Sequence, residues 1–309
     1  MEHFADRLVG AIRRRGNPVL VGLDPRLDSL PPSVRGEVER ESDPDAVAAA
    51  YWAFCREVID VVAPLVPAVK PQMAFFEQWG PPGMQALAQV IAYAHQHDLL
   101  VIVDGKRNDI GTTAAGYASG YLGCGTSSVW GGDALTVSPY LGADSVEPFV
   151  ATACERGGGV FVLVKTSNPG GGLFQDLMCG ALPLYRHVAA FVEQLAERTK
   201  GSAGYGAVGA VAGATYPEQL AELRQAMPHS WFLVPGFGTQ GAAARDVRSA
   251  FHDDGLGAIV NNSRGIIFAH ARPEYRDRFG ATQWQRAVEQ ATVAMIDQLR
   301  ADTPAGQLG

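Results

Sequence analysis

Short, uninterrupted apolar runs recur along the whole chain. They span residues 19–23, 65–69, 99–103, 134–137, 160–164, 207–212, 231–234 and 258–260. The runs are continuous rather than alternating, which is typical of parallel strands buried on both faces. The pattern therefore predicts eight strands of a parallel sheet.

Stretches with helical periodicity separate these runs. Apolar residues recur every three or four positions through residues 47–61, 184–195 and 284–299. Strands that alternate with helices eight times predict a single (β/α)8 TIM barrel, in the α/β class. A doubly wound open sheet is the alternative, but no glycine-rich dinucleotide fingerprint follows the first run, which weakens it.

No internal domain boundary is convincing, so residues 1–309 are expected to form one catalytic domain. Residues 31–45, which begin with Pro31-Pro32, form a charged insertion before the first long helical stretch. Residues 302–309 are expected to fray.

Composition narrows the function classes. The chain has 309 residues, 47% of them apolar and 18% charged, which is enough for one large core. A net charge of −7 argues against an extended nucleic-acid surface, and no apolar stretch approaches a membrane span. The first 15 residues do not resemble a signal peptide. Four scattered cysteines without metal-type spacing indicate reduced thiols in a cytoplasmic protein.

Charged residues gather where the second and third strands should end. Lys70 follows one run, and Asp104, Lys106 and Asp109 follow the next. In TIM barrels the active site lies at the carboxyl ends of the strands. A cation held there beside a reacting carbon can stabilise a carbanion and then protonate it. The alternative is a pair of ordinary salt bridges on the barrel rim. Two strand ends and a turn contribute to the cluster, however, which favours a catalytic role.

Glycines and an arginine follow the last two strands. Gly236, Gly238 and Gly241 let the backbone approach an anion closely, and Arg264 can grip phosphate oxygens with two parallel hydrogen bonds. Phosphate sites of TIM barrels form from these two loops. The alternative is that these glycines only permit tight turns, but the occurrence of the pattern in both loops favours phosphate binding.

Two further strand ends leave their alternatives open. Asp24 before Pro25 either shapes a turn or accepts hydrogen bonds from a sugar hydroxyl. Ser167 and Asn168 either cap the next helix or contact a polar heterocycle. No histidine- or carboxylate-rich metal pattern stands at the strand ends, so no metal site is predicted.

The motifs together resemble the orotidine 5′-phosphate decarboxylase family. The resemblance rests on Asp104-x-Lys106-x-x-Asp109-Ile110 with Thr113, and on matching residues at the other strand ends. These are Asp24, Lys70, Ser167-Asn168-Pro169-Gly170, Pro235-Gly-x-Gly-x-Gln240-Gly241 and Ser263-Arg264-Gly265. The match runs from about residue 17 to residue 268 and is most similar to the longer bacterial subgroup. Gly111 stands where many relatives have proline, and it is expected to loosen that turn.

The resemblance implies loss of the C6 carboxylate of orotidine 5′-phosphate as CO₂, which gives UMP without metal or organic cofactor in the last step of UMP biosynthesis. It makes Lys106 the proton donor and places Asp104 near the departing carboxylate. It also makes Lys70 a catalytic residue that holds Asp104 and a ribose hydroxyl in place, and it gives Asp24 a contact with the ribose.

The resemblance also assigns the remaining site residues. Ser167 matches the residue that contacts the pyrimidine, and Gln240 and Arg264, with Gly265 beside them, match the phosphate site. Asp109, Ile110 and Thr113 match a segment that reaches the neighbouring subunit's pocket, which implies a homodimer with shared active sites.

Two other functions compete with this one. The first is a magnesium-dependent sugar-phosphate decarboxylase on the same scaffold, in which a metal-binding glutamate stands where this chain has Lys70. The second is a non-catalytic nucleotide-phosphate binding protein that kept the pocket. The complete charge set and the absence of an appended interaction region in the sequence favour the enzyme.

Overall fold

Eight parallel strands close into a barrel. The computed structural model describes residues 1–39, 43–123, 127–238 and 243–308. The barrel strands are β1 (Val19–Leu23), β2 (Ala68–Pro71), β3 (Leu100–Arg107), β4 (Ala134–Val137), β5 (Gly159–Lys165), β8 (Val208–Ala212), β9 (Phe232–Val234) and β10 (Ala258–Asn262). Their order around the barrel is β1-β10-β9-β8-β5-β4-β3-β2. The predicted (β/α)8 barrel is confirmed, and each predicted apolar run contributes to one strand.

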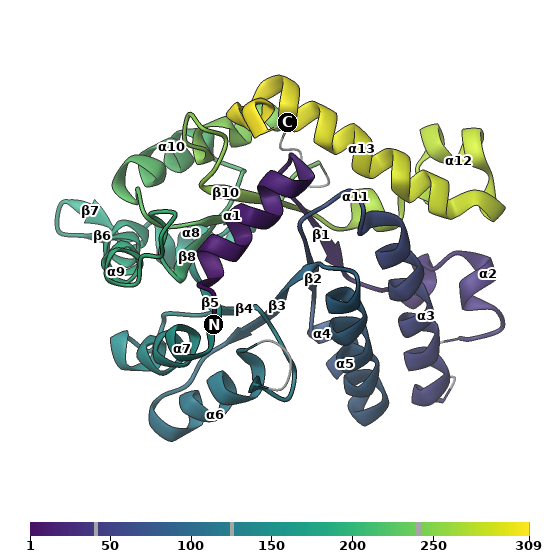
Figure 1. Ribbon diagram of the computed structural model, residues 1–309, viewed down its shortest axis with the longest axis horizontal. Coiled ribbons are helices and arrows are strands. Elements are labelled where there is room, and N and C mark those ends of the chain that lie inside the picture. The colour runs from purple at the N-terminus through teal and green to yellow at the C-terminus, as the bar shows by residue number, and fades with distance from the viewer. Residues whose placement is uncertain (40–42, 124–126, 239–242, 309) are drawn as a thin grey trace.

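Helices surround this barrel (Figure 1). The longer ones are α1 (Phe4–Arg15), α3 (Pro44–Val62), α5 (Gly80–Gln96), α6 (Gly111–Tyr121), α7 (Ala143–Arg156), α9 (Leu184–Arg198), α10 (Pro217–Ala226) and α13 (Trp284–Asp302). Short helices fill the connections: α2 (Pro32–Arg35), α4 (Ala74–Glu77), α8 (Gly172–Gln175), α11 (Arg264–Ile267) and α12 (Pro273–Phe279). An antiparallel hairpin of β6 (Met178–Cys179) and β7 (Leu182–Pro183) lies between β5 and α9.

The apolar core has two layers, which explains why the strand runs are continuous. Alternate strand residues such as Leu20, Ile102 and Phe161 fill the barrel interior. The residues between them, such as Val19 and Val101, pack outward against the helices. Both faces of the apolar strand segments are therefore covered, and no polar alternation appears in these parts of the sequence.

Helix α1 crosses one end of the barrel (Figure 1). Its residues Phe4, Leu8 and Ile12 join the interior cluster, and a Cβ atom on Gly159, at the start of β5, would lie 2.3 Å from the Phe4 ring. The sequence specifies this helix locally, because the His3 side chain caps its first turn and Gly16 ends it in a left-handed conformation. The helix covers the end where the strands begin, so the opposite end remains for ligands.

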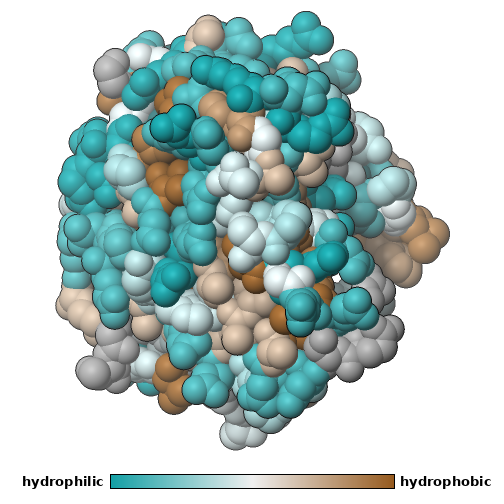
Figure 2. All heavy atoms as spheres, turned by 90° about the vertical axis from the view of Figure 1, so that its right-hand side faces the viewer, coloured by the Kyte–Doolittle hydropathy of each residue, from teal (hydrophilic) through white to brown (hydrophobic). Residues whose placement is uncertain are grey.

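The outer faces of the helices are polar. Figure 2 shows the side of the molecule that carries α2, α3 and α12 as largely hydrophilic, with scattered apolar residues. The charged insertion of residues 31–45 contains α2, and Asp43 caps the start of α3 by accepting a hydrogen bond from the Asp45 amide. None of the helices in the described part of the chain has the length and apolar content needed to cross a membrane.

The C-terminal segment differs from the expectation of a frayed tail. Residues 304–308 form a 3₁₀ helix, and Ala305 is fully buried. The Thr303 hydroxyl donates a hydrogen bond to the Leu299 carbonyl at 2.6 Å and accepts one from the Ala305 amide at 3.2 Å. This hydroxyl turns the chain back onto α13, so the segment is anchored by a contact that composition alone does not reveal.

Asp133 ties together four elements at the closed end of the barrel. Its carboxylate is buried just before β4 and accepts hydrogen bonds from Arg7 of α1, from His95 of α5 at 2.9 Å and from the Val101 amide of β3 at 2.8 Å. A buried carboxylate with several donors fixes the relative positions of the groups that it joins.

We predict that Asp133→Ala lowers the free energy of unfolding by about 3 kcal/mol, because Arg7 loses its buried counterion and the Val101 amide loses its acceptor. Urea denaturation measures the change. Asp297→Ala, on the exposed face of α13, is the matched control and should stay within about 0.5 kcal/mol of the parent. Equal effects of the two substitutions would contradict the assignment.

Candidate active site

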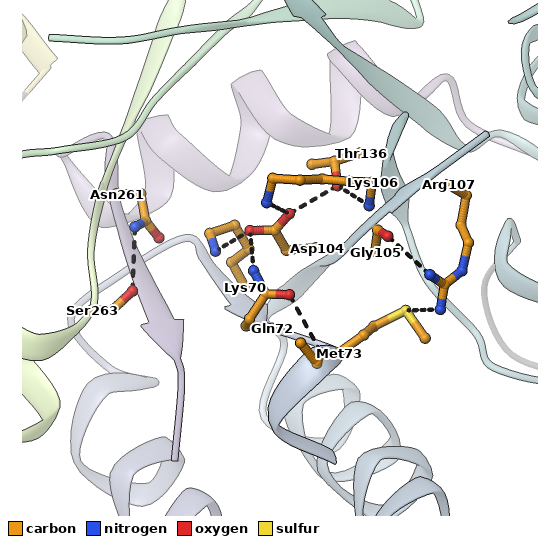
Figure 3. Close-up of polar contacts among 11 residues, drawn as sticks. Lys70, Gln72, Met73, Asp104, Gly105, Lys106, Arg107, Thr136, Asn261 and Ser263 are labelled. Atoms are coloured by element: carbon orange, nitrogen blue, oxygen red, sulfur yellow. Dashed lines mark hydrogen bonds and ion pairs between the residues drawn. The ribbon is translucent and has the colours of Figure 1, made fainter. Parts of the chain in front are cut away.

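The Asp104 carboxylate receives four hydrogen bonds at the open end of the barrel. Its Oδ2 accepts from Lys70 Nζ at 2.8 Å and from Gln72 Nε2 at 3.0 Å. Its Oδ1 accepts from Lys106 Nζ at 2.7 Å and from Thr136 Oγ1 at 2.9 Å. Figure 3 shows these side chains converging on Asp104. The carboxylate is thus fully hydrogen-bonded, and two positive charges share it.

Burial and charge act in opposite directions on this cluster. Burial raises the pKa of Asp104, but the attraction of Lys70 and Lys106 and their hydrogen bonds outweigh it and hold the pKa well below its usual value. Burial also penalises the charged form of Lys70 and so lowers its pKa. The charges of Asp104 and Asp24 outweigh this effect and raise the pKa above the ordinary 10.5. Lys70 and Asp104 therefore remain charged while being almost fully buried.

Lys106 differs from Lys70 in exposure and in backbone conformation. Its side chain is 48% exposed, whereas that of Lys70 is 6% exposed. The register of β3 against β4 shifts between Val103 and Arg107, and Lys106 has a φ of +43°. A left-handed lysine costs on the order of 1–2 kcal/mol. Strand β3 is thus bent at Lys106, and the Lys106 amide bonds to Thr136 Oγ1 at 2.9 Å across the shift.

A central cavity of about 210 Å³ lies beside this cluster. Its walls combine the charged groups with an apolar floor and a polar rim. The lining residues are Lys70, Asp104, Lys106, Thr136, Leu163, Thr166, Ser167, Asn168, Val211, Leu233, Pro235 and Asn261. A flat, polar heterocycle needs this mixture of apolar faces and edge-directed hydrogen-bonding groups.

Two buried acceptors near the barrel mouth have no hydrogen-bond partner among the described residues: Asp24 Oδ1 and Asn261 Oδ1. An unsatisfied buried acceptor costs about 1–3 kcal/mol, so a ligand or a bound water that supplies a donor here would stabilise the site. Gly22 makes room for this arrangement, because a Cβ atom there would lie 1.8 Å from Ser263 Oγ and 3.1 Å from Asn261 Oδ1.

A second, larger cavity of about 510 Å³ lies at the ends of β9 and β10. It is lined by Gly238, Asn262, Arg264, Gly265 and Arg272. Gly238 has a φ of +72°, a conformation that favours glycine. Arg272 Nη1 donates to the Gly265 carbonyl at 3.2 Å, so two guanidinium groups border the cavity. Such a pair suits a phosphate dianion.

Comparison with known proteins identifies the family. Residues 18–276 match the model of the orotidine 5′-phosphate decarboxylase / HUMPS family. The chain belongs to this family. An orotidine 5′-phosphate decarboxylase of Rhodopirellula baltica is 57% identical over 302 residues, which cover 97% of this chain and all of that protein. One of Caldicellulosiruptor bescii is 39% identical, with 90% of this chain and 93% of that protein covered. The solved OMP decarboxylase of Leishmania donovani is 32% identical, with a TM-score of 0.72 and coverage of 97% and 98%.

The structure brings several of the residues that the family motif suggested to the two cavities. Lys70, Asp104, Lys106 and Ser167 line the central cavity. Arg264 and Gly265 line the second one, although the Gly265 amide already donates to Asn262 Oδ1 at 3.2 Å. Gln240 lies outside the described residues.

Asp109, Ile110 and Thr113 stand apart from both cavities. Asp109 Oδ1 accepts a hydrogen bond from the Ile110 amide at 2.8 Å, and Ile110 and Thr113 are exposed around the start of α6. Of the four charged residues expected near the barrel mouth, Lys70, Asp104 and Lys106 are joined by hydrogen bonds. Gly111 has a φ of +53°, so it directs the turn into α6 rather than merely loosening it.

Gln72, Thr136, Asn261 and Arg272 were not predicted from the sequence. Gln72 immediately follows β2, so its place beside Lys70 gave a usable signal. Thr136 lies within an apolar strand and carries no local motif, whereas Asn261 directly follows the apolar run 258–260 and so had the same strand-end signal. Arg272 reaches its cavity from a turn seven positions after Gly265, and only the fold shows that proximity.

The sequence predicts no metal site, and the described residues bear on that expectation. Across residues 1–39, 43–123, 127–238 and 243–308, no group of three or more histidine, cysteine or carboxylate side chains is arranged to hold a metal ion.

We predict that Asp104→Asn destabilises the protein by about 3 kcal/mol at about pH 6 and by clearly less at about pH 9. In the parent, the raised pKa of Lys70 keeps its stabilising contribution intact until the pH exceeds the ordinary 10.5. In the variant, buried Lys70 loses this counterion and its pKa falls, so rising pH lets it deprotonate and relieves the cost. Urea denaturation at both pH values tests this, and a pH-independent difference would contradict it.

Proposed function

We propose that this protein decarboxylates orotidine 5′-phosphate to UMP and CO₂ without a metal ion or organic cofactor. The observation that carries the proposal is the Lys70–Asp104–Lys106 cluster, which presents a partly exposed ammonium to a cavity lined for a heterocycle. Relatives that are named orotidine 5′-phosphate decarboxylases match nearly the whole chain, at up to 57% identity among those described above.

The two cavities divide the substrate between them. The phosphate binds beside Arg264, Gly265 and Arg272, and Gln240 joins them as the family motif implies. The orotate ring enters the central cavity over its apolar floor, where Ser167 contacts the pyrimidine. Phosphate binding far from the reacting carbon supplies free energy that holds the ring in place during the reaction.

The chemistry takes place at C6 of the ring. The bond between C6 and the carboxylate breaks, CO₂ departs, and the electron pair stays on C6 in the plane of the ring, where π delocalisation gives little stabilisation. The Lys106 ammonium stabilises this carbanion and then transfers a proton to C6. Asp104 faces the departing carboxylate and fixes Lys106 through their 2.7 Å hydrogen bond. Water then reprotonates the lysine.

The remaining groups position the ribose and the cluster. The unpaired Oδ1 atoms of Asp24 and Asn261 accept hydrogen bonds from donors of the nucleotide, with the ribose hydroxyls assigned to Asp24. Lys70 holds Asp104 at 2.8 Å and contacts a ribose hydroxyl. These contacts replace the missing partners of the buried acceptors, so substrate binding also relieves their desolvation cost.

A magnesium-dependent sugar-phosphate decarboxylase is a poorer match to this geometry. Lys70 Nζ lies 2.8 Å from Asp104, at the strand end where such a relative carries its metal-binding glutamate. An ammonium at that place repels a divalent cation. A non-catalytic nucleotide sensor would not need the strained backbone at Lys106.

The protein is further proposed to act as a homodimer with shared active sites. Asp109, Ile110 and Thr113 line neither of the two cavities of their own chain, and the large apolar residues Tyr117 in α6 and Tyr140 and Leu141 after β4 are exposed. Exposed apolar groups of this kind mark contact surfaces. In the dimer, Asp109 and Thr113 reach the cavity of the neighbouring subunit.

The whole chain is proposed to work as one catalytic domain in the cytoplasm. Support comes from the thiols of Cys55, Cys154 and Cys179, which are free. Unpaired thiols are typical of a reducing compartment.

We predict that the purified protein releases CO₂ from orotidine 5′-phosphate equally well with and without EDTA. Lys106→Ala should lower turnover by at least about 10⁴-fold, since it removes both the charge that stabilises the carbanion and the proton donor. Lys200→Ala is the control, because it changes an exposed lysine that lines neither cavity, and it should retain full activity. Loss of activity in EDTA with recovery in magnesium would favour the metal-dependent alternative. Tight UMP binding without CO₂ release would favour the sensor.

We predict that Lys106→Ala and Asp109→Ala proteins, each weakly active, regain activity when their subunits exchange. A site that takes Lys106 from one chain and Asp109 from the other is intact in each mixed dimer, so about one quarter of all sites recover at equal mixing. CO₂ release after refolding the mixture measures this. If subunit exchange is demonstrated by mass labelling and activity stays at the level of the separate variants, the site is not shared.

A further inference from the structure

Lys165, the last residue of β5, is a buried lysine that the proposed chemistry does not use. It is 3% exposed and does not line either cavity. Its ammonium forms an ion pair with Asp176, and it lies 5.2 Å from the ring centroid of Tyr185 and 5.5 Å from that of Tyr216. Asp176 is half-exposed, so the pair combines a fully desolvated cation with a hydrated anion.

Such a pair is a poor source of stability. Burying an ammonium costs several kcal/mol, and one partly hydrated carboxylate with two aromatic faces recovers only part of it. A methionine would fill the same space without that cost. The charge at this place is better explained by what it holds than by the free energy it contributes to folding.

The ion pair is one half of a two-point attachment. The Thr166 amide donates to Gln175 Oε1 at 3.0 Å, and Gln175 Nε2 donates to Thr166 Oγ1 at 2.8 Å. The end of α8 thus binds the end of β5 at two consecutive positions. Asp176 pairs with Lys165, and Gln175 bonds to Thr166. The Thr166 hydroxyl also bonds to Asn168 Oδ1 at 2.6 Å, which carries the attachment one step further along the loop.

This attachment lies next to the substrate cavity. Thr166, Ser167 and Asn168 all line it. Ser167 is confined from the other side by Gly213, where an added Cβ atom would lie 2.9 Å from the Ser167 backbone nitrogen. Ser167 thus lies between Gly213, which follows β8, on one side and the Lys165–Asp176 attachment on the other.

The rest of the excursion between β5 and α9 has little packing of its own. Its large apolar side chains are exposed: Leu173, Phe174, Leu177, Met178 and Leu182. The hairpin of β6 and β7 has only two residues in each strand. A segment with so few buried contacts depends on its attachment points for a defined position.

We propose that Lys165 is a positioning residue: through Asp176 it holds the excursion of residues 166–183 so that Ser167 meets the base of the bound nucleotide. The assignment rests on the proposed function for the identity of the ligand, a pyrimidine nucleoside 5′-phosphate. In this proposal Lys165 itself does not contact the substrate. The effect of the lysine is therefore confined to the base end of the ligand.

The test compares two ligands that differ only by the base. Affinities of UMP and of ribose 5-phosphate are measured by calorimetry for the parent, Lys165→Met and Lys200→Met. Lys165→Met should weaken UMP binding about tenfold, which corresponds to the loss of one well-placed hydrogen bond, and leave ribose 5-phosphate within about twofold. Lys200→Met, an exposed lysine exchanged for the same residue, should change neither. Equal weakening of both ligands, or no weakening of UMP, would overturn the proposal.

A second variant keeps the test decisive if Lys165→Met does not fold. Asp176→Asn alters a half-exposed side chain and removes the other partner of the pair. It should reproduce the selective loss of UMP affinity, and the double variant should bind UMP no more weakly than the weaker single variant, because both changes break one interaction. Additive losses would contradict a shared role.

Steady-state kinetics separate this proposal from the proposed function. Lys165→Met should raise KM for orotidine 5′-phosphate about tenfold and change kcat by less than about threefold, since Asp104 and Lys106 are untouched. If the parent releases no CO₂, the proposed function fails, whereas the base-selective binding loss still decides the role of Lys165. If the parent is active and Lys165→Met lowers kcat alone, the positioning role fails.

Discussion

Two ammonium groups share the carboxylate of Asp104, and the open end of the barrel is organised around this sharing. Lys70 and Lys106 repel each other, and burial penalises the charge on Lys70. Both positive charges persist at the site because Asp104 accepts a hydrogen bond from each, at 2.8 and 2.7 Å. Gln72 and Thr136 occupy the remaining acceptor positions, so the carboxylate cannot rotate away. The result is a fixed cation at a cavity wall, which water alone would not hold in place.

The fold was largely predictable because burial on both faces leaves a clear signature. The eight apolar runs match the eight barrel strands to within a few residues, since interior and exterior positions of a barrel strand are both apolar. Strand β3 extends to Arg107, four residues beyond its apolar run, because the register shift lets charged residues continue the ladder. The β6–β7 hairpin and the anchored tail escaped prediction, since two-residue strands and a single Thr303 hydroxyl have no periodicity.

The candidate site was predictable where function and strand ends coincide. Lys70, Asp104 and Ser167 follow apolar runs, and all three line the central cavity, as the rule that barrel sites lie at the carboxyl ends of strands predicts. Asp109 also follows this strand end but does not line the cavity of its own chain, because the chain turns into α6 immediately afterwards. Arg272 carries no local signal, since its position at the second cavity depends on neighbours that the fold brings together.

The backbone of Lys106 sets a limit on how this protein can be made more robust. A side chain at a φ of +43° is disfavoured relative to glycine, which adopts that region without steric conflict. Replacement by glycine would therefore relax strand β3 and remove a charge from the cluster in one step. The two effects oppose each other, because the same substitution takes from the buried Asp104 carboxylate the hydrogen bond that Lys106 donates at 2.7 Å. Stabilising substitutions that leave this cluster intact therefore belong to other parts of the molecule, such as the helical shell and the closed end of the barrel.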